Sequence, residues 1–128
     1  MGIWGSKVVV VDDDLDTLEL VRCLLRLQGA QVVGVSTPGE ALTTVIGVMP
    51  EVLLVDIAMP GEDGYALIRQ VRALASDRGG RIPAAALTAY ATLEDRRRAL
   101  LAGYNEHIPK PVDPTRLIAT VAGLIPAN

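Results

Sequence analysis

Short apolar runs alternate along the chain with longer segments of helical periodicity, and this alternation strongly constrains the fold. Four of the runs are built from Val, Leu, Ala or a single Gly and are bounded by polar or turn residues. Runs this short predict strands that are buried on both faces of a sheet. We expect five strands, the last with the weakest pattern, at residues 8–11, 32–35, 52–55, 84–87 and 106–108.

The segments between these runs have the spacing of amphipathic helices. Leu18, Val21 and Leu25 form one apolar stripe, and Gly29 stands at the C-cap position. Strands that alternate with helices indicate a parallel sheet covered on both faces, in one α/β domain over residues 1–128 with a core at about 7–124. The expected helices are at residues 14–28, 38–48, 63–74, 92–102 and 113–124.

Composition excludes several classes of protein. Half of the 128 residues are hydrophobic and the mean hydropathy is +0.35, which excludes a disordered chain. The net charge of −3 argues against a nucleic-acid-binding protein. The first residues lack the pattern of a secretory signal, and the apolar stretch at residues 117–125 is too short to cross a membrane. Cys23, the single cysteine, is expected to be a small core residue. Because one cysteine cannot form an internal disulfide, we expect a cytoplasmic protein.

Reactive side chains stand where the predicted strands end. Asp12, Asp13 and Asp14 follow the first strand and Asp56 follows the third. Thr88 follows the fourth strand, and Lys110, flanked by prolines, follows the fifth. Because parallel strands end at the same edge of a sheet, these side chains are expected to lie together.

These residue types suit phosphoryl chemistry with a hard cation. Neighbouring carboxylates repel one another unless a cation neutralises them, and Mg²⁺ prefers a few carboxylates together with retained waters. An ionised aspartate is also a nucleophile that forms an aspartyl phosphate. A lysine and a hydroxyl, such as Lys110 and Thr88, then stabilise the phosphoryl oxygens.

Four motifs in this order resemble the receiver domain of two-component response regulators. They are VVVVDDD at the first strand, DIAMPGEDG from Asp56, ALTAYA at the fourth strand and HIPKP at the fifth. The resemblance covers residues 7–124. It implies a flavodoxin-like sheet of order 2-1-3-4-5, in which the first and third strands are neighbours.

The resemblance also implies a role for each residue. Asp56 would accept a phosphoryl group from a phosphohistidine on a partner histidine kinase or phosphotransfer protein. Mg²⁺ would be bound by Asp13, Asp56 and the backbone carbonyl of Ala58, with Asp12 acting directly or through water. Lys110 would pair with the phosphoryl group, and its bond to Pro111 would be cis.

The resemblance implies a conformational switch as well. Thr88 would turn towards the phosphate and shift the face formed by the fourth helix, the fifth strand and the fifth helix. His107 stands where the family has its switch aromatic, so it is either a switch residue or an ordinary buried strand residue.

Simpler interpretations remain open for other residues. Asp12 to Asp14 could cap a helix, and Lys110 could be a solvated lysine in a turn. Arg96, Arg97 and Arg98 form either a solvated helix face or part of a partner surface.

The sequence thus predicts a phosphorylation-dependent signalling switch that acts on a downstream protein target. Its catalysis is limited to its own phosphorylation and dephosphorylation, so it is not a conventional enzyme. It is either a stand-alone receiver or the receiver of a hybrid histidine kinase, and homodimerisation is left open. The alternatives are a phosphorylation-independent scaffold, a small phosphatase with an aspartate nucleophile, and a nucleotide-binding flavodoxin-like protein, for which no phosphate-binding glycine loop is present.

Overall fold

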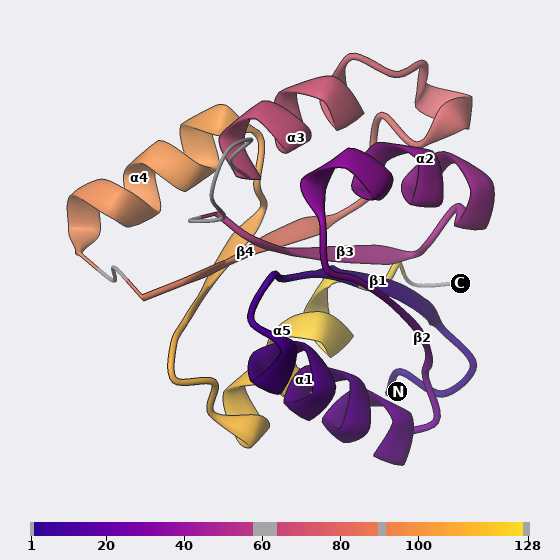
Figure 1. The fold of residues 1–128 in the computed structure, drawn as a ribbon, viewed down its shortest axis with the longest axis vertical. Coiled ribbons are helices and arrows are strands. Elements are labelled where there is room, and N and C mark those ends of the chain that lie inside the picture. The colour runs from indigo at the N-terminus through magenta and orange to yellow at the C-terminus, as the bar shows by residue number, and fades with distance from the viewer. Residues whose placement is uncertain (1, 58–63, 90–91, 127–128) are drawn as a thin grey trace.

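The protein forms a five-stranded parallel sheet between two layers of helices (Figure 1). The computed structural model describes residues 2–57, 64–89 and 92–126, apart from the side chain of Pro38. The strands are β1 (Lys7–Val11), β2 (Gln31–Val35), β3 (Val52–Asp56), β4 (Ala84–Thr88) and β5 (Glu106–Pro109). The helices are α1 (Leu15–Leu27), α2 (Pro38–Val48), α3 (Gly64–Arg72), α4 (Leu93–Ala102) and α5 (Pro114–Leu124).

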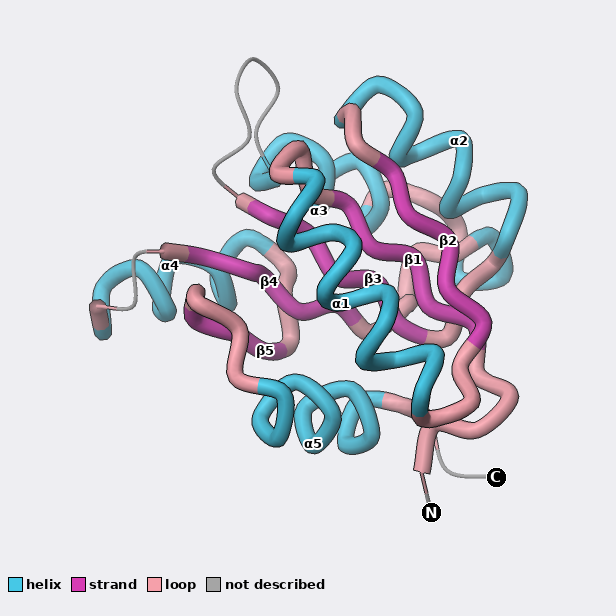
Figure 2. The backbone as a smooth tube through the Cα atoms, turned by 60° about the horizontal axis from the view of Figure 1, so that its bottom comes forward, coloured by secondary structure: helices cyan, strands magenta, loops and turns pink. Residues whose placement is uncertain are grey.

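The strand order is β2-β1-β3-β4-β5 and all neighbouring strands pair in parallel, which confirms the predicted fold. The order reverses between β1 and β3, because the chain extends the sheet first on one side of β1 and then on the other. A reversal of this kind leaves a crevice at the carboxyl ends of the two strands, where open parallel sheets bind their ligands. Figure 2 shows β1 and β3 side by side, with α1 crossing one face of the sheet.

The side-chain alternation of each strand divides the core into two layers. Val8 and Val10 of β1 pack with α1 and α5, whereas Val9 and Val11 pack on the opposite face with α2 and α3. All four valines are fully buried. Continuous apolar runs are therefore required, because neither face of the central strands contacts water.

The helix boundaries follow the capping residues. Asp14 accepts a hydrogen bond from the Asp16 amide at 3.1 Å and begins α1, and Gly29, at φ +88°, follows its last turn. The third helix is shorter than predicted and is followed by a single 3₁₀ turn at Ser76–Arg78, which the sequence analysis did not predict. None of the described helices combines the length and apolar character needed to cross a membrane.

The prediction that Cys23 is a core residue is wrong. Leu18, Val21 and Leu25 form the buried stripe of α1, and Cys23 lies on the opposite, exposed side of the helix. The small apolar character of a cysteine did not outweigh the helical periodicity set by the larger leucine and valine side chains.

Candidate functional site

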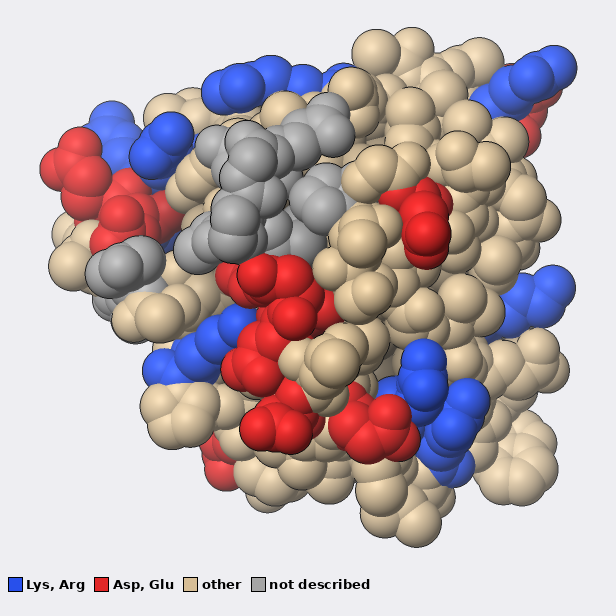
Figure 3. Space-filling model, in the orientation of Figure 1, with Lys and Arg blue, Asp and Glu red and all other residues tan. Residues whose placement is uncertain are grey.

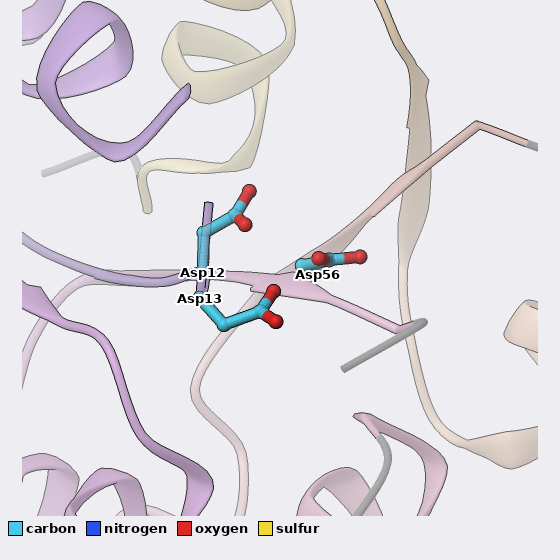
Figure 4. A group of neighbouring side chains, drawn as sticks. All are labelled: Asp12, Asp13 and Asp56. Atoms are coloured by element: carbon cyan, nitrogen blue, oxygen red, sulfur yellow. The ribbon is translucent and has the colours of Figure 1, made fainter. Parts of the chain in front are cut away.

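Three carboxylates meet at the carboxyl ends of β1 and β3. Asp12 directly follows β1, and Asp56 is the last residue of β3, one position further than the neighbouring pair Val11 and Val55. Oxygen atoms of Asp12, Asp13 and Asp56 all lie within 4.8 Å of one another (Figure 4). Asp12 is fully buried and Asp56 is 5% exposed, whereas Asp13 is exposed to solvent. The strand order therefore brings together the acids that the sequence analysis selected.

The three consecutive acids after β1 have different roles. Asp14 caps α1, since its side chain accepts hydrogen bonds from the Asp16 amide and, at 2.8 Å, from the Thr17 hydroxyl. The side chain of Asp12 accepts a hydrogen bond from the Asp14 amide at 2.9 Å, and its own amide donates to the Val35 carbonyl at 3.0 Å. The capping interpretation is thus correct for Asp14, while Asp12 and Asp13 belong to the acidic cluster.

Lys110 joins this cluster from the far end of the sheet. Its Nζ atom lies 3.0 Å from Asp12 Oδ2 and 3.4 Å from Asp56 Oδ2, and 18% of the side chain is exposed. The Lys110 amide donates to the Thr88 carbonyl at 2.7 Å, and the Lys110–Pro111 bond is cis, as the family resemblance implied. The ammonium group therefore contacts two carboxylates, so the interpretation of Lys110 as a solvated lysine is wrong.

The pKa values of Asp12 and Lys110 are both raised, but for opposite reasons. Burial raises the pKa of Asp12 to about 6, despite the opposing hydrogen bond from the Asp14 amide and the attraction of Lys110. Burial alone would lower the pKa of Lys110, but the carboxylates of Asp12 and Asp56 outweigh it and raise the pKa. Lys110 is therefore charged at neutral pH.

The cluster fits a divalent cation. At neutral pH a single ammonium group faces three carboxylates, two of which are buried, so negative charge remains in excess. Mg²⁺ prefers a small number of oxygen ligands and keeps several bound waters. The cluster offers both, because its oxygens are few and its side at the exposed Asp13 is open to water. Ala58, whose backbone carbonyl is the fourth predicted ligand, lies outside the described residues.

Thr88 and His107 lie on one face of the sheet. Thr88 is the last residue of β4 and is fully buried. His107 pairs with Ala86, two residues before Thr88, and residues two apart on a strand share a face. Ala86 belongs to the core layer under α2, α3 and α4, so both side chains face that layer. His107 is 6% exposed, and its Nε2 atom has no hydrogen-bond partner among the described residues.

One contact near the site has no counterpart among the sequence-based predictions. The buried hydroxyl of Tyr104 donates a 2.7 Å hydrogen bond to the carbonyl of Gly64, the first residue of α3. This bond anchors α3 where the chain returns from the segment after Asp56. The two residues are forty positions apart, so no local pattern in the sequence indicates the contact.

The fold and the acidic edge together define a receiver domain, and comparison with known proteins agrees. Residues 8–122 match the family described as the response regulator receiver domain. The chain is 46% identical over 114 residues to an uncharacterized 14.6 kDa protein of Leptolyngbya boryana, covering 89% of this chain and 86% of that protein. It is 33% identical over 124 residues to the transcriptional regulatory protein PrrA of Mycobacterium tuberculosis, covering 97% of this chain but 52% of PrrA.

A solved structure shows the same architecture. A putative response regulator from Chloroflexus aurantiacus superposes with a TM-score of 0.87 at 29% identity, covering 94% of this chain and 97% of that one. The chain belongs to the receiver-domain family of response regulators. Receiver domains are signalling switches of two-component systems, which work by phosphorylation, bind Mg²⁺ at an acidic pocket, and interact with histidine kinases and downstream effectors.

Proposed function

We propose that Asp56 accepts a phosphoryl group from a phosphohistidine of a partner histidine kinase or phosphotransfer protein. A carboxylate oxygen of Asp56 attacks the phosphorus atom, a P–O bond forms, and the P–N bond breaks as the imidazole nitrogen leaves with the electron pair. The observation that carries this proposal is the position of Lys110, whose ammonium lies 3.4 Å from Asp56 Oδ2 while it is also paired with Asp12. A fixed positive charge there stabilises the phosphoryl oxygens as negative charge builds on them.

The remaining side chains complete the proposed site. Asp12, Asp13 and Asp56 would hold Mg²⁺, which when bound neutralises negative charge on the phosphoryl oxygens. The hydroxyl of Thr88, at the neighbouring strand end, would donate to a phosphoryl oxygen. The resulting movement, with His107 on the same face, would be the switch that a downstream protein target detects.

The burial of the acceptor supports a switch rather than a broad-specificity phosphatase. Asp56 is 5% exposed and lies between strand ends, so a small donor or one presented histidine reaches it more readily than a large ester. The single exposed cysteine and the proposed kinase partner both agree with action in the cytoplasm.

Intact-protein mass spectrometry after incubation with acetyl phosphate, with and without Mg²⁺, tests this proposal. We expect one phosphoryl adduct that requires Mg²⁺ and is lost in Asp56→Asn. Asp16→Asn, which removes an exposed acid of α1 outside the cluster, is the matched control and keeps the adduct. Absence of an adduct at the shortest accessible times would contradict the proposal and favour the phosphorylation-independent scaffold.

A further inference from the structure

Helix α4 leaves most of its apolar surface uncovered. Among the described residues its only buried side chain is Ala99, whereas Leu93 and Leu101 are 82% and 81% exposed. A helix on the surface of a domain normally buries its leucines against the core. Leu93 and Leu101 therefore contribute little to folding, and they leave apolar surface on α4 that is available for contact outside the domain.

A groove runs along the side of α4 that faces α3. It has a volume of about 630 Å³, and α3 contributes one residue to its lining, Arg69. The other described lining residues come from α4 and are Glu94, Arg97, Arg98, Leu101 and Ala102. Leu93 and Leu100 line a second hollow on α4, and Arg97 borders both hollows, whereas Leu101 lines the groove beside α3.

A contact with an aromatic ring holds one guanidinium group of this groove, that of Arg98, in place. Arg98 lies over the ring of Tyr65, with its central carbon 4.2 Å from the ring centroid. Tyr65 is buried in α3, so this cation–π contact joins the two walls of the groove. A guanidinium stacked by its face keeps its N–H groups at the rim of the plane, where carboxylates bind.

The charge of the groove is opposite to that of the protein. Among the described residues that line the groove, three are arginines and one is a glutamate, whereas the chain carries a net charge of −3. In Figure 3 basic side chains lie along the top and left of the view, over α3 and α4, with acidic side chains beside them at the far left, and a larger acidic group lies near the centre. A local positive groove with an exposed leucine selects an acidic partner with an apolar side, and the net negative charge disfavours nucleic acid.

We propose that the groove between α3 and α4 binds an acidic, amphipathic helical segment of a partner protein. Leucine-type side chains of the segment would cover Leu101 and Ala102, and its carboxylates would pair with Arg69 and Arg97. This is the helix-in-groove mode of recognition, in which apolar residues three and four apart provide the anchors. The proposal rests on the surface of α3 and α4 and does not require phosphorylation of Asp56.

Fluorescence anisotropy with three labelled designed peptides tests the proposal on the full chain without a phosphodonor. The first peptide is a helix of about fourteen residues with leucines at helical spacing and glutamates between them. The second replaces the glutamates by lysines, and the third replaces the leucines by serines. We expect the first to bind with a dissociation constant of about 100 μM or tighter, and the other two to bind about tenfold more weakly or worse.

Two groove variants and one control locate the binding. Arg97→Glu and Leu101→Ser are expected to weaken binding of the first peptide by about tenfold and about fivefold. Arg26→Glu changes the net charge equally on α1, at the other face of the sheet, and leaves binding unchanged. Circular dichroism confirms that each variant is folded.

Three results would overturn the proposal. The first is no binding of the acidic leucine peptide at millimolar concentration. The second is binding of the serine peptide as tight as that of the leucine peptide, or displacement of the leucine peptide by inorganic phosphate of the same total negative charge. Either outcome would identify a simple anion site. The third is a wild-type dimer in sedimentation velocity that Arg97→Glu dissociates, which would identify a second copy of the chain as the occupant.

Discussion

Helices α1 and α4 both follow a strand at the carboxyl edge of the sheet, but the domain holds them to different degrees. Each is capped by a side chain, α1 by Asp14 and α4 by Thr92, which accepts from the Asp95 amide at 3.1 Å. Beyond the cap, α1 buries a stripe of three apolar residues, whereas α4 buries only Ala99 among the described residues.

This difference separates two tasks within one sheet edge. At the start of α1 the Asp14 amide holds the side chain of Asp12 in place, and the proposed metal and phosphoryl site needs such fixed geometry. Helix α4 is attached by few buried contacts and presents leucines and arginines to the outside. A weakly packed element is free to shift at small cost in free energy, which suits the part of a switch that contacts a partner.

The largest effect that tests this comparison is on stability. Leu25→Ala in α1 is expected to lower the free energy of unfolding by about 3 kcal/mol, because it leaves a cavity in a fully buried site. Leu101→Ala in α4 is expected to change it by less than about 0.5 kcal/mol, since that side chain is 81% exposed. Urea denaturation monitored by circular dichroism measures both; similar losses in the two variants would show that α4 is held as firmly as α1.

A smaller effect is expected at the acidic edge, and it depends on pH. The pKa of Asp12 rises from 3.8 to about 6 on folding, so the folded state binds the proton more tightly than the unfolded state. The protonated Asp12 side chain therefore contributes its full stabilisation of the folded state below about pH 4. This stabilisation is lost as the pH rises to about 6, because the buried carboxyl group then ionises. In magnesium-free buffer Asp12→Asn is expected to raise the free energy of unfolding at pH 7 by about 2 kcal/mol.

The pH profile distinguishes this cause from a general change in stability. The free energy of unfolding that Asp12→Asn gains over the wild type should shrink towards zero as the pH falls from 6 to 4. At the lower pH the wild-type Asp12 is protonated in the folded state, so it is neutral like the asparagine of the variant. Lys110 keeps Asp56 as a partner in the variant, so its charge stays compensated. Glu94→Gln in the first turn of α4 is the exposed control and should change stability by less than about 0.5 kcal/mol. A gain that is constant with pH would refute the assignment.

The smallest effect concerns the contact that ties α4 to α3. Arg98→Ala removes the cation–π contact with Tyr65 and is expected to lower the free energy of unfolding by about 0.5 kcal/mol. Arg97→Ala removes a neighbouring arginine without such a contact in the described structure and should have almost no effect. Thermal unfolding of the two variants side by side compares them, and equal midpoints would show that Arg98 does not hold the helix.

Local patterns were enough to predict the elements. The apolar runs and helical stripes placed all five strands and all five helices, because strand and helix periods depend only on neighbouring residues. The edge that holds Asp12, Asp56, Thr88 and Lys110 also followed, since parallel strands end together. The strand order came from the family resemblance, because short buried strands carry no local signal for their neighbour.

Long-range contacts account for what the sequence did not predict. Arg72 was not singled out from the sequence, yet its guanidinium donates to the carbonyls of Gly80, Ile82 and Gly103. These carbonyls come from two loops, one before β4 and one before β5, which only the pairing of these strands brings to one place. The exposed side of Cys23 and the groove beside α4 likewise depend on which face each helix turns to the sheet.

The sequence by itself thus determined the strands, the helices and the chemical character of the reactive edge, because these follow from side-chain period and residue type. Only the tertiary structure decided that Lys110 lies between Asp12 and Asp56, and that the leucines of α4 stay outside the core. The physical reason is that a contact between distant residues depends on how the strands pair and how the helices rotate onto them. Packing of the whole domain sets that arrangement.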